Sequence, residues 1–196
     1  MHQAPMHFIR LLFALMLAIT FSPARAADID GQHFDDRIRL ADADLVLNGT
    51  GLRAVAWLKG YAAGLYLVQK ATSTEAVLAQ TGPKRLRMKM MVDVDAKEFV
   101  KAFDKGMRRN LSEAERAPLT ERMERFDRTV GALPQLKKGD VVDLDYLPAR
   151  GLVLSVNGKP HGEPFAGEEF YAGVLKIYIG RDPVDKKLKA GLLGQA

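Results

Sequence analysis

The sequence of 196 residues contains no cysteine, and this absence excludes several classes of function. A chain without thiols has no cysteine nucleophile, no iron–sulfur cluster, no Cys-ligated zinc and no disulfide scaffold. Histidine is also scarce, since only His33 and His161 follow residue 26 and neither has a second ligand at metal-binding spacing. We therefore interpret both as surface or turn residues, and we expect no metal site and no cofactor.

A large excess of one charge and a catalytic serine are also missing. Lys+Arg 29 against Asp+Glu 24 gives a formal net charge of +5. Bases and acids are interleaved and no recognition motif is present, so we predict no nucleic-acid partner. No serine stands in a G-x-S-x-G context. Asp143 and Asp145 share one face of an expected strand, and we interpret them as solvent-exposed, which makes them poor general acids.

Long hydrophobic runs are absent except at the N-terminus. Arg10 precedes the apolar run LLFALMLAITF (11–21), and Ala24 and Ala26 follow in the A-x-A spacing of a signal-peptidase site. This run has eleven residues, whereas a helix that spans a membrane needs about 20 apolar residues. The alternative is a segment that is not cleaved and stays in the membrane as an anchor. The sequence therefore predicts a signal peptide over 1–26 and a single domain over 27–196. We expect export across an inner membrane to the periplasm, and no stable membrane insertion after cleavage.

Hydrophobic periodicity predicts the elements of the remaining chain. Apolar residues at helical spacing and capping patterns indicate helices, whereas alternating patterns indicate strands. Gly49 and Gly51 interrupt an extended stretch and indicate a bulge or tight turn. Strands are expected over 44–69, 84–94, 141–147 and 152–157. Helices are expected over 72–79, 95–108, 119–133 and 167–179, followed by a short one that ends at Gly194. This order is typical of an α+β fold with a large, mostly antiparallel sheet covered by helices.

One arginine is a candidate for ligand binding. Arg53 lies between apolar extended segments and is followed by Tyr61 and Tyr66. A guanidinium in an apolar cleft requires an anion, and its planar fork matches a carboxylate through two parallel hydrogen bonds. The alternative interpretation is an arginine that pairs with an acid of the protein or is exposed at the bend.

Several stretches resemble the chalcone isomerase-like family over nearly all of the chain after residue 26. They are LNGTGLR (47–53), YAAGLYL (61–67), FVKAFDKGMRRNL (99–111), SVNGK (155–159) and IGRDPVDKKLKAGLLG (179–194). The resemblance implies an open-faced β-sandwich in which a ligand cleft lies between the sheet and a helical layer. It also implies that Arg53 corresponds to an arginine with two uses in the family. Plant chalcone isomerases polarise their substrate with it, and fatty-acid-binding relatives hold a carboxylate with it and a tyrosine.

The resemblance favours a binder over an enzyme. Tyr61 falls where the binders have a tyrosine, whereas Phe99 falls on a tyrosine of the enzymes and Gly106 on an asparagine. A late serine or threonine of the enzymes falls near Ile177. Three polar positions of the enzymes are therefore apolar or lack a side chain, while the arginine is retained. Such a site favours an alkyl chain with an acidic head over a polyphenol.

The resulting prediction is an exported, non-catalytic binder of a small acidic, apolar, fatty-acid-like ligand. Arg53 and Tyr61 are expected to hold its carboxylate. Further candidates for lining the tunnel, or alternatively for plain core packing, are Met88, Met90, Phe99 and Phe103. The alternatives are an isomerase of the intramolecular lyase type, with Arg53 as electrostatic catalyst, a haem-binding module, and an interaction module without a pocket ligand. The oligomeric state is not indicated by the sequence.

Overall fold

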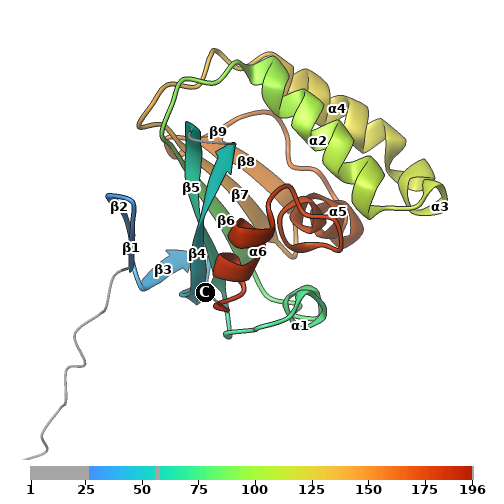
Figure 1. Cartoon of the computed structure of the whole chain (residues 1–196). Coiled ribbons are helices and arrows are strands. Elements are labelled where there is room, and N and C mark those ends of the chain that lie inside the picture. Colours follow the sequence, from blue (N-terminus) through green and yellow to red (C-terminus); the bar gives the residue numbers. More distant parts are fainter. Residues whose placement is uncertain (1–26, 56–57, 196) are drawn as a thin grey trace, which may run out of the picture.

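A computed structural model of the chain describes residues 27–55 and 58–195 (Figure 1). The expected signal peptide lies outside the described residues. The main sheet has seven strands, all antiparallel, which follow one another in chain order. They are β3 (Arg37–Leu40), β4 (Ala43–Val55), β5 (Leu58–Leu67), β6 (Lys84–Met90), β7 (Val141–Leu147), β8 (Gly151–Val156) and β9 (Lys159–Pro160).

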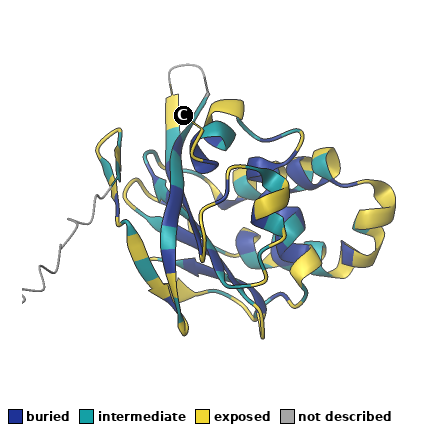
Figure 2. Ribbon diagram, turned by 90° about the horizontal axis from the view of Figure 1, so that it is seen from below, coloured by how far each residue is buried: buried dark blue, intermediate teal, exposed yellow. Residues whose placement is uncertain are grey.

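A layer of helices packs on one face of this sheet (Figure 1). The helices are α1 (Thr74–Leu78), α2 (Ala96–Asn110), α3 (Glu113–Arg116), α4 (Thr120–Gly131), α5 (Glu168–Ile179) and α6 (Lys186–Leu192), with one 3-10 turn (Ala117–Leu119) between α3 and α4. Figure 2 shows that the helices turn buried residues toward the sheet and exposed residues outward. The architecture is the α+β, open-faced sandwich predicted from the sequence. Among the described residues, no helix has the length and apolar character needed to cross a membrane.

Most predicted elements are present, with shifted ends. The side chain of Asp95 accepts a hydrogen bond from the amide of Lys97 and caps α2, as its pattern predicted. The cap of α1 is Ser73 and not the expected Thr72. Strand β6 ends at Met90, four residues before the predicted end. The short helix α3, with its capping box, was not predicted.

The bulge predicted at the two glycines of the first long strand is present next to Gly49, whereas Gly51 is in regular pairing with Ala63. The pairing of β4 with β5 shifts register between Leu47 and Gly49, which is a β-bulge. The backbone of α6 packs directly on this place. A Cβ on Gly49 would lie 2.1 Å from the carbonyl oxygen of Gly191, and a Cβ on Gly51 2.8 Å from that of Leu188. Only glycine allows this approach, which holds α6 beside the strand that carries Arg53.

The opposite face of the sheet is covered in part, which corrects one prediction. The hairpin of β1 (Ala27–Ile29) and β2 (Gln32–Phe34) contributes Phe34 to a second, smaller core on this face. Asp143 and Asp145 are only 3% and 5% exposed, so the prediction that they are solvated was wrong. They form bidentate pairs with arginines of the neighbouring strand: Arg87 donates to Asp143 at 2.8 Å, and Arg85 donates to Asp145 at 2.6 Å.

The error about these acids has a physical cause. In the antiparallel register of β6 and β7, Arg85 lies opposite Asp145 and Arg87 opposite Asp143. Opposite charges at directly paired positions satisfy each other, so the face can be buried although its side chains are charged. Each strand by itself shows only an alternation of charged and apolar residues, which is also the pattern of a solvated face.

A candidate ligand pocket between the sheet and α2

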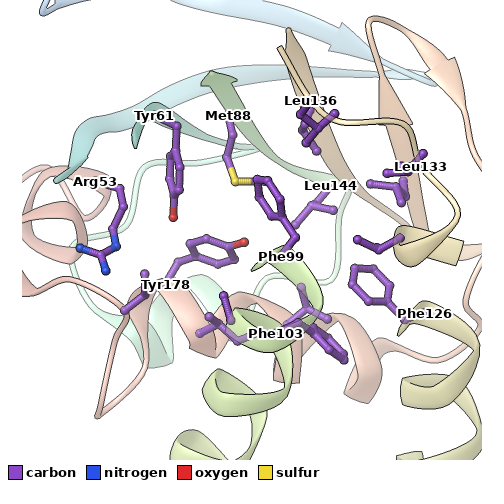
Figure 3. A pocket seen from close by; sticks show the side chains of 17 residues that line it. Arg53, Tyr61, Met88, Phe99, Phe103, Phe126, Leu133, Leu136, Leu144 and Tyr178 are labelled. Atoms are coloured by element: carbon purple, nitrogen blue, oxygen red, sulfur yellow. The ribbon is translucent and has the colours of Figure 1, made fainter. Parts of the chain in front are cut away.

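A partly open pocket of about 150 Å³ lies between the sheet and the helices. It is bounded by β4 to β8 on one side and by α2, α4 and α5 on the other. Figure 3 shows the side chains that surround it. Aromatic and aliphatic residues make up nearly all of its wall: Met88, Phe99, Ala102, Phe103, Phe126, Val130, Leu133, Leu136, Val142, Leu144, Leu154, Val174, Ile177 and Val184. The polar groups of the wall belong to three residues, Arg53, Tyr61 and Tyr178.

These three residues gather at one end of the cavity. Arg53 on β4 and Tyr61 on β5 are directly paired in the antiparallel register, so the fold places them side by side. Tyr178 reaches the same place from α5. In Figure 3 the hydroxyl of Tyr61 is directed toward Tyr178, whose own hydroxyl is directed away from Arg53 and toward Phe99, whereas Phe126 and Leu133 lie at the other end. The pocket is therefore amphipathic along its length.

Arg53 is mostly buried and is already partly engaged. Its side chain is 24% exposed. Nη1 donates to the carbonyl oxygen of Ala54 at 2.6 Å and lies 3.4 Å from Oδ2 of Asp185. Asp185 in turn caps α6, since its Oδ1 accepts hydrogen bonds from the amides of Lys187 and Leu188. The structure thus contains the arginine–acid pair that was the alternative interpretation of Arg53, but the pair uses one of the two terminal nitrogens.

The two tyrosine hydroxyls are available as hydrogen-bond donors. The described residues give neither hydroxyl a hydrogen-bond partner. Burial raises the pKa of Tyr61 well above its usual value, and the neighbouring Tyr178 raises it further, while Arg53 opposes the shift. Burial also raises the pKa of Tyr178. Both phenols therefore stay protonated at neutral pH and can donate to an acceptor that enters the pocket.

The far end of the cavity is held by fixed side chains. Phe126 stacks on Phe103, with ring centroids 4.4 Å apart, and makes an edge contact with Phe165 at 5.4 Å. Leu136 forms two backbone hydrogen bonds with Val94, of 2.8 and 3.0 Å, which fasten the segment after α4 to the end of the sheet. These contacts oppose an extension of the cavity in this direction.

A second, polar groove adjoins the cavity on the surface. It shares Arg53, Ala102, Ile177 and Val184 with the cavity, so Arg53 stands between the two spaces. The other residues around this groove are mainly charged: Glu98, Lys101, Lys105, Gly106, Arg109 and Asp182. Lys101 donates to Glu98 at 2.7 Å and Arg109 donates to Asp182 at 2.5 Å, and with Arg53 and Lys105 the lining of the groove carries a net positive charge. The arrangement indicates that the polar end of the pocket is its mouth.

The structure brings together five of the six residues proposed from the sequence. Arg53, Tyr61, Met88, Phe99 and Phe103 all line the cavity. Met90 does not line it. Met90 is 1% exposed and belongs to the core at the last position of β6, where its backbone pairs with Gly139 and Asp140. Whether the five lining residues bind a ligand stays a prediction.

The position of Gly106 also has a structural explanation. A Cβ on Gly106 would lie 2.6 Å from Cγ2 of Ile177. The missing side chain therefore allows α2 and α5 to pack closely, which brings Phe99 and Phe103 onto the sheet. An asparagine here would separate the two helices.

Sequence reasoning missed Tyr178 and Asp185 as parts of the site. Both lie more than 120 residues from Arg53 in the chain, so only the tertiary fold brings them to it. Helical periodicity identified Phe126, Val130 and Leu133 as buried, but it does not separate residues around a cavity from those of a filled core. Within 27–55 and 58–195, no group of His, Asp and Glu has the geometry of a metal site.

Comparisons with known proteins agree with this architecture. The sequence profile of a family described as chalcone isomerase-like matches residues 26–194. Among solved structures, the crystal structure of a fatty-acid binding protein from Arabidopsis thaliana superposes with a TM-score of 0.65 and 17% sequence identity. The match covers 86% of this chain and 96% of that protein. At this identity the likeness shows a common fold. No curated protein sequence matches the chain.

Proposed function

Because the chain belongs to the chalcone isomerase-like family, we propose that it is a non-catalytic member that binds a small apolar carboxylic acid. The observation that carries this proposal is the distribution of polar groups around the cavity. The wall is apolar except at one end, where Arg53 and Tyr61 lie, and the hydroxyl of Tyr178 is directed inward from this end toward Phe99. An amphiphile with one anionic end has this same distribution.

The recognition step follows from the chemistry of the three residues. A carboxylate at the mouth accepts a charge-assisted hydrogen bond from a free nitrogen of Arg53. The hydroxyl of Tyr61, on the strand next to that of Arg53, donates to a remaining lone pair of the carboxylate. The apolar part of the ligand then replaces solvent against the phenylalanine and leucine side chains, which supplies most of the binding free energy.

A catalytic role is less well supported by the same wall. Proton transfer requires a group that exchanges a proton near neutral pH. Among the described residues the cavity contains no histidine, aspartate or glutamate, and the raised pKa of Tyr61 makes its phenol a donor and not a base. An isomerase mechanism would have to depend on the electrostatic effect of Arg53 alone, and Asp185 partly neutralises that charge.

A haem-binding role has even less support from the pocket. Described residues of the wall offer no histidine as an axial ligand. A pocket of about 150 Å³ is also much smaller than a porphyrin.

Export to the periplasm is part of the proposal and rests on the sequence. Arg10, the apolar run 11–21 and the A-x-A spacing of Ala24 and Ala26 support a cleaved signal peptide. N-terminal sequencing of the protein expressed in a Gram-negative host tests it. A mature N-terminus at Ala27 in the periplasmic fraction is expected, and a cytoplasmic protein that keeps residues 1–26 would contradict it.

Calorimetric titration with carboxylic acids tests the binding function. Octanoate, dodecanoate and 3-phenylpropanoate are titrated into the wild type, Arg53→Ala and Arg39→Ala. Arg39 is a matched control, because it also lies on a strand of the sheet but is exposed and pairs with Asp44. We expect at least one acid to bind, Arg39→Ala to behave as wild type, and Arg53→Ala to lose about tenfold or more in affinity.

Two results would contradict the binding function. The first is the absence of binding for every acid in the wild type. The second is turnover of a chalcone well above the spontaneous rate, abolished in Arg53→Ala, which would establish the isomerase. Native mass spectrometry of protein purified from its own host adds an independent readout, since a co-purified acid identifies the ligand directly.

A further inference from the structure

The size of the cavity restricts the ligand more than its polarity does. The pocket measures about 150 Å³, whereas pockets for drug-sized ligands commonly measure about 300–1,000 Å³. An engineered protein cavity of about 150 Å³, lined by leucine, isoleucine and phenylalanine, binds benzene. A single six-membered ring with a short substituent therefore fits into the space, whereas a long acyl chain does not fit into it without displacing side chains.

The walls of the cavity oppose such a displacement. Phe126 is held between Phe103 and Phe165 in the aromatic cluster, and Leu136 is fastened through its backbone to Val94. Close-packed groups of this kind resist the insertion of extra methylenes, because the insertion forces side chains off their preferred rotamers. The depth available from the mouth at Arg53 is therefore set by the fold.

The chemistry of the wall favours a flat ring over an aliphatic chain. Five aromatic side chains surround the space: Tyr61, Phe99, Phe103, Phe126 and Tyr178. Aromatic rings contact one another in offset and edge-to-face arrangements that add to the burial of area. These rings come from the sheet and from three helices, so an enclosed ring meets aromatic partners from several directions.

From size, rigidity and aromatic walls together, we propose that the ligand class is a carboxylic acid carried on a single aromatic ring by a short linker. The inference rests on the proposed function and deepens it. The ring occupies the closed end near Phe103 and Phe126. A linker of one to three atoms spans the region beside Tyr61 and Tyr178. The carboxylate lies at Arg53, next to the polar groove.

A series of acids titrated into the wild-type protein tests this ligand class. The probes are 3-phenylpropanoate, octanoate, dodecanoate and hexadecanoate. We expect 3-phenylpropanoate to bind at least tenfold more tightly than hexadecanoate. A long tunnel predicts the opposite, because each additional buried methylene raises affinity by about fourfold, the fold-change that corresponds to ~0.8 kcal/mol.

The outcomes separate the two proposals. Affinity that rises steadily through hexadecanoate overturns the single-ring inference and leaves the binding function intact. The absence of binding for every acid overturns the binding function itself. Tightest binding of 3-phenylpropanoate supports both.

A variant that deepens the pocket gives a second readout. Leu133→Ala removes a side chain at the closed end of the cavity. Leu78→Ala is its matched control, because Leu78 is also a partly buried leucine packed against the core but does not line the cavity. We expect Leu133→Ala to shift the preference about tenfold toward dodecanoate relative to 3-phenylpropanoate, and Leu78→Ala to leave it unchanged. An equal preference in both variants would overturn the limit set by the closed end.

Discussion

Asp185 is the residue whose replacement tests the anion site most directly. It lies 3.4 Å from Arg53, and the two side chains are only 17% and 24% exposed. A ligand carboxylate bound to Arg53 must therefore share the guanidinium with a carboxylate of the protein. The change Asp185→Asn removes the competing charge. Asparagine caps helices about as well as aspartate, so the hydrogen bonds to the start of α6 are retained.

The expected gain in affinity follows from Coulomb's law. A ligand carboxylate on the far side of the guanidinium lies roughly 6 Å from Asp185. At an effective dielectric of about 40, suitable for a partly exposed pair, the repulsion between the two carboxylates is ~1.4 kcal/mol. Its removal raises the affinity for a carboxylic acid about tenfold. The protein itself loses an ion pair of up to ~1 kcal/mol, which leaves it folded.

Calorimetry with a matched pair of ligands measures this effect. The acid that binds best and its primary amide are titrated into the wild type and Asp185→Asn. We expect the acid to gain about tenfold and the amide to stay within twofold, because the amide carries no charge. Equal affinities of the acid for the two proteins, with unchanged circular dichroism, would refute the placement of the carboxylate at Arg53.

Chemical denaturation tests three further expectations about stability. Gly49→Ala lowers the free energy of unfolding by about 2 kcal/mol, because the new Cβ meets the backbone of α6. Its control is Gly131→Ala, where the new Cβ lies in open space at the end of a helix. This variant raises the free energy of unfolding by up to ~1 kcal/mol. Asp145→Ala leaves Arg85 without its bidentate partner and lowers the free energy of unfolding by about 3 kcal/mol. A decrease below ~1 kcal/mol would contradict a stabilising role of the pair.

The third expectation concerns Asp127. Burial, together with the neighbouring Asp104, raises the pKa of Asp127 in the folded protein from 3.8 to about 6. The folded state therefore binds the proton more tightly, and its contribution to stability is present below about pH 4 and lost as pH rises through 6. After allowance for solvent screening the effect is ~1 kcal/mol. Asp127→Asn should remove this part of the pH dependence, and an unchanged profile would contradict it.

Local sequence patterns predicted much of the fold. The apolar spacing behind Asp95 was sufficient to place a helix over Phe99 and Phe103, and alternation was sufficient to place β6 and the β7–β8 hairpin. Both signals are local, since they depend on 3.6-residue and two-residue periods within one element. The ends of elements were less certain, as Ser73 and Met90 show, because neighbouring residues can cap a helix equally well and pairing partners decide where a strand ends.

Part of the site could also be predicted. Arg53 and Tyr61 stand on adjoining strands, and the seven residues between them are close to what one hairpin needs, so their juxtaposition is nearly local. Met88, Phe99 and Phe103 were recognised as apolar residues of the correct faces. The same reasoning placed Met90 in the pocket, because alternation shows the face of a strand but not the distance along it at which a cavity ends.

The absence of cysteine and the shortage of histidine were evident from the sequence. They already excluded thiol nucleophiles, iron–sulfur clusters and Cys-ligated zinc. The sequence also determined the elements and the arginine. Only the tertiary structure decided that Asp185 shares the charge of Arg53, that Tyr178 adds a second hydroxyl, and that the space between them holds about 150 Å³. These properties depend on contacts between segments far apart in the chain. The volume of a cavity is the space that all the side chains packed around it leave empty.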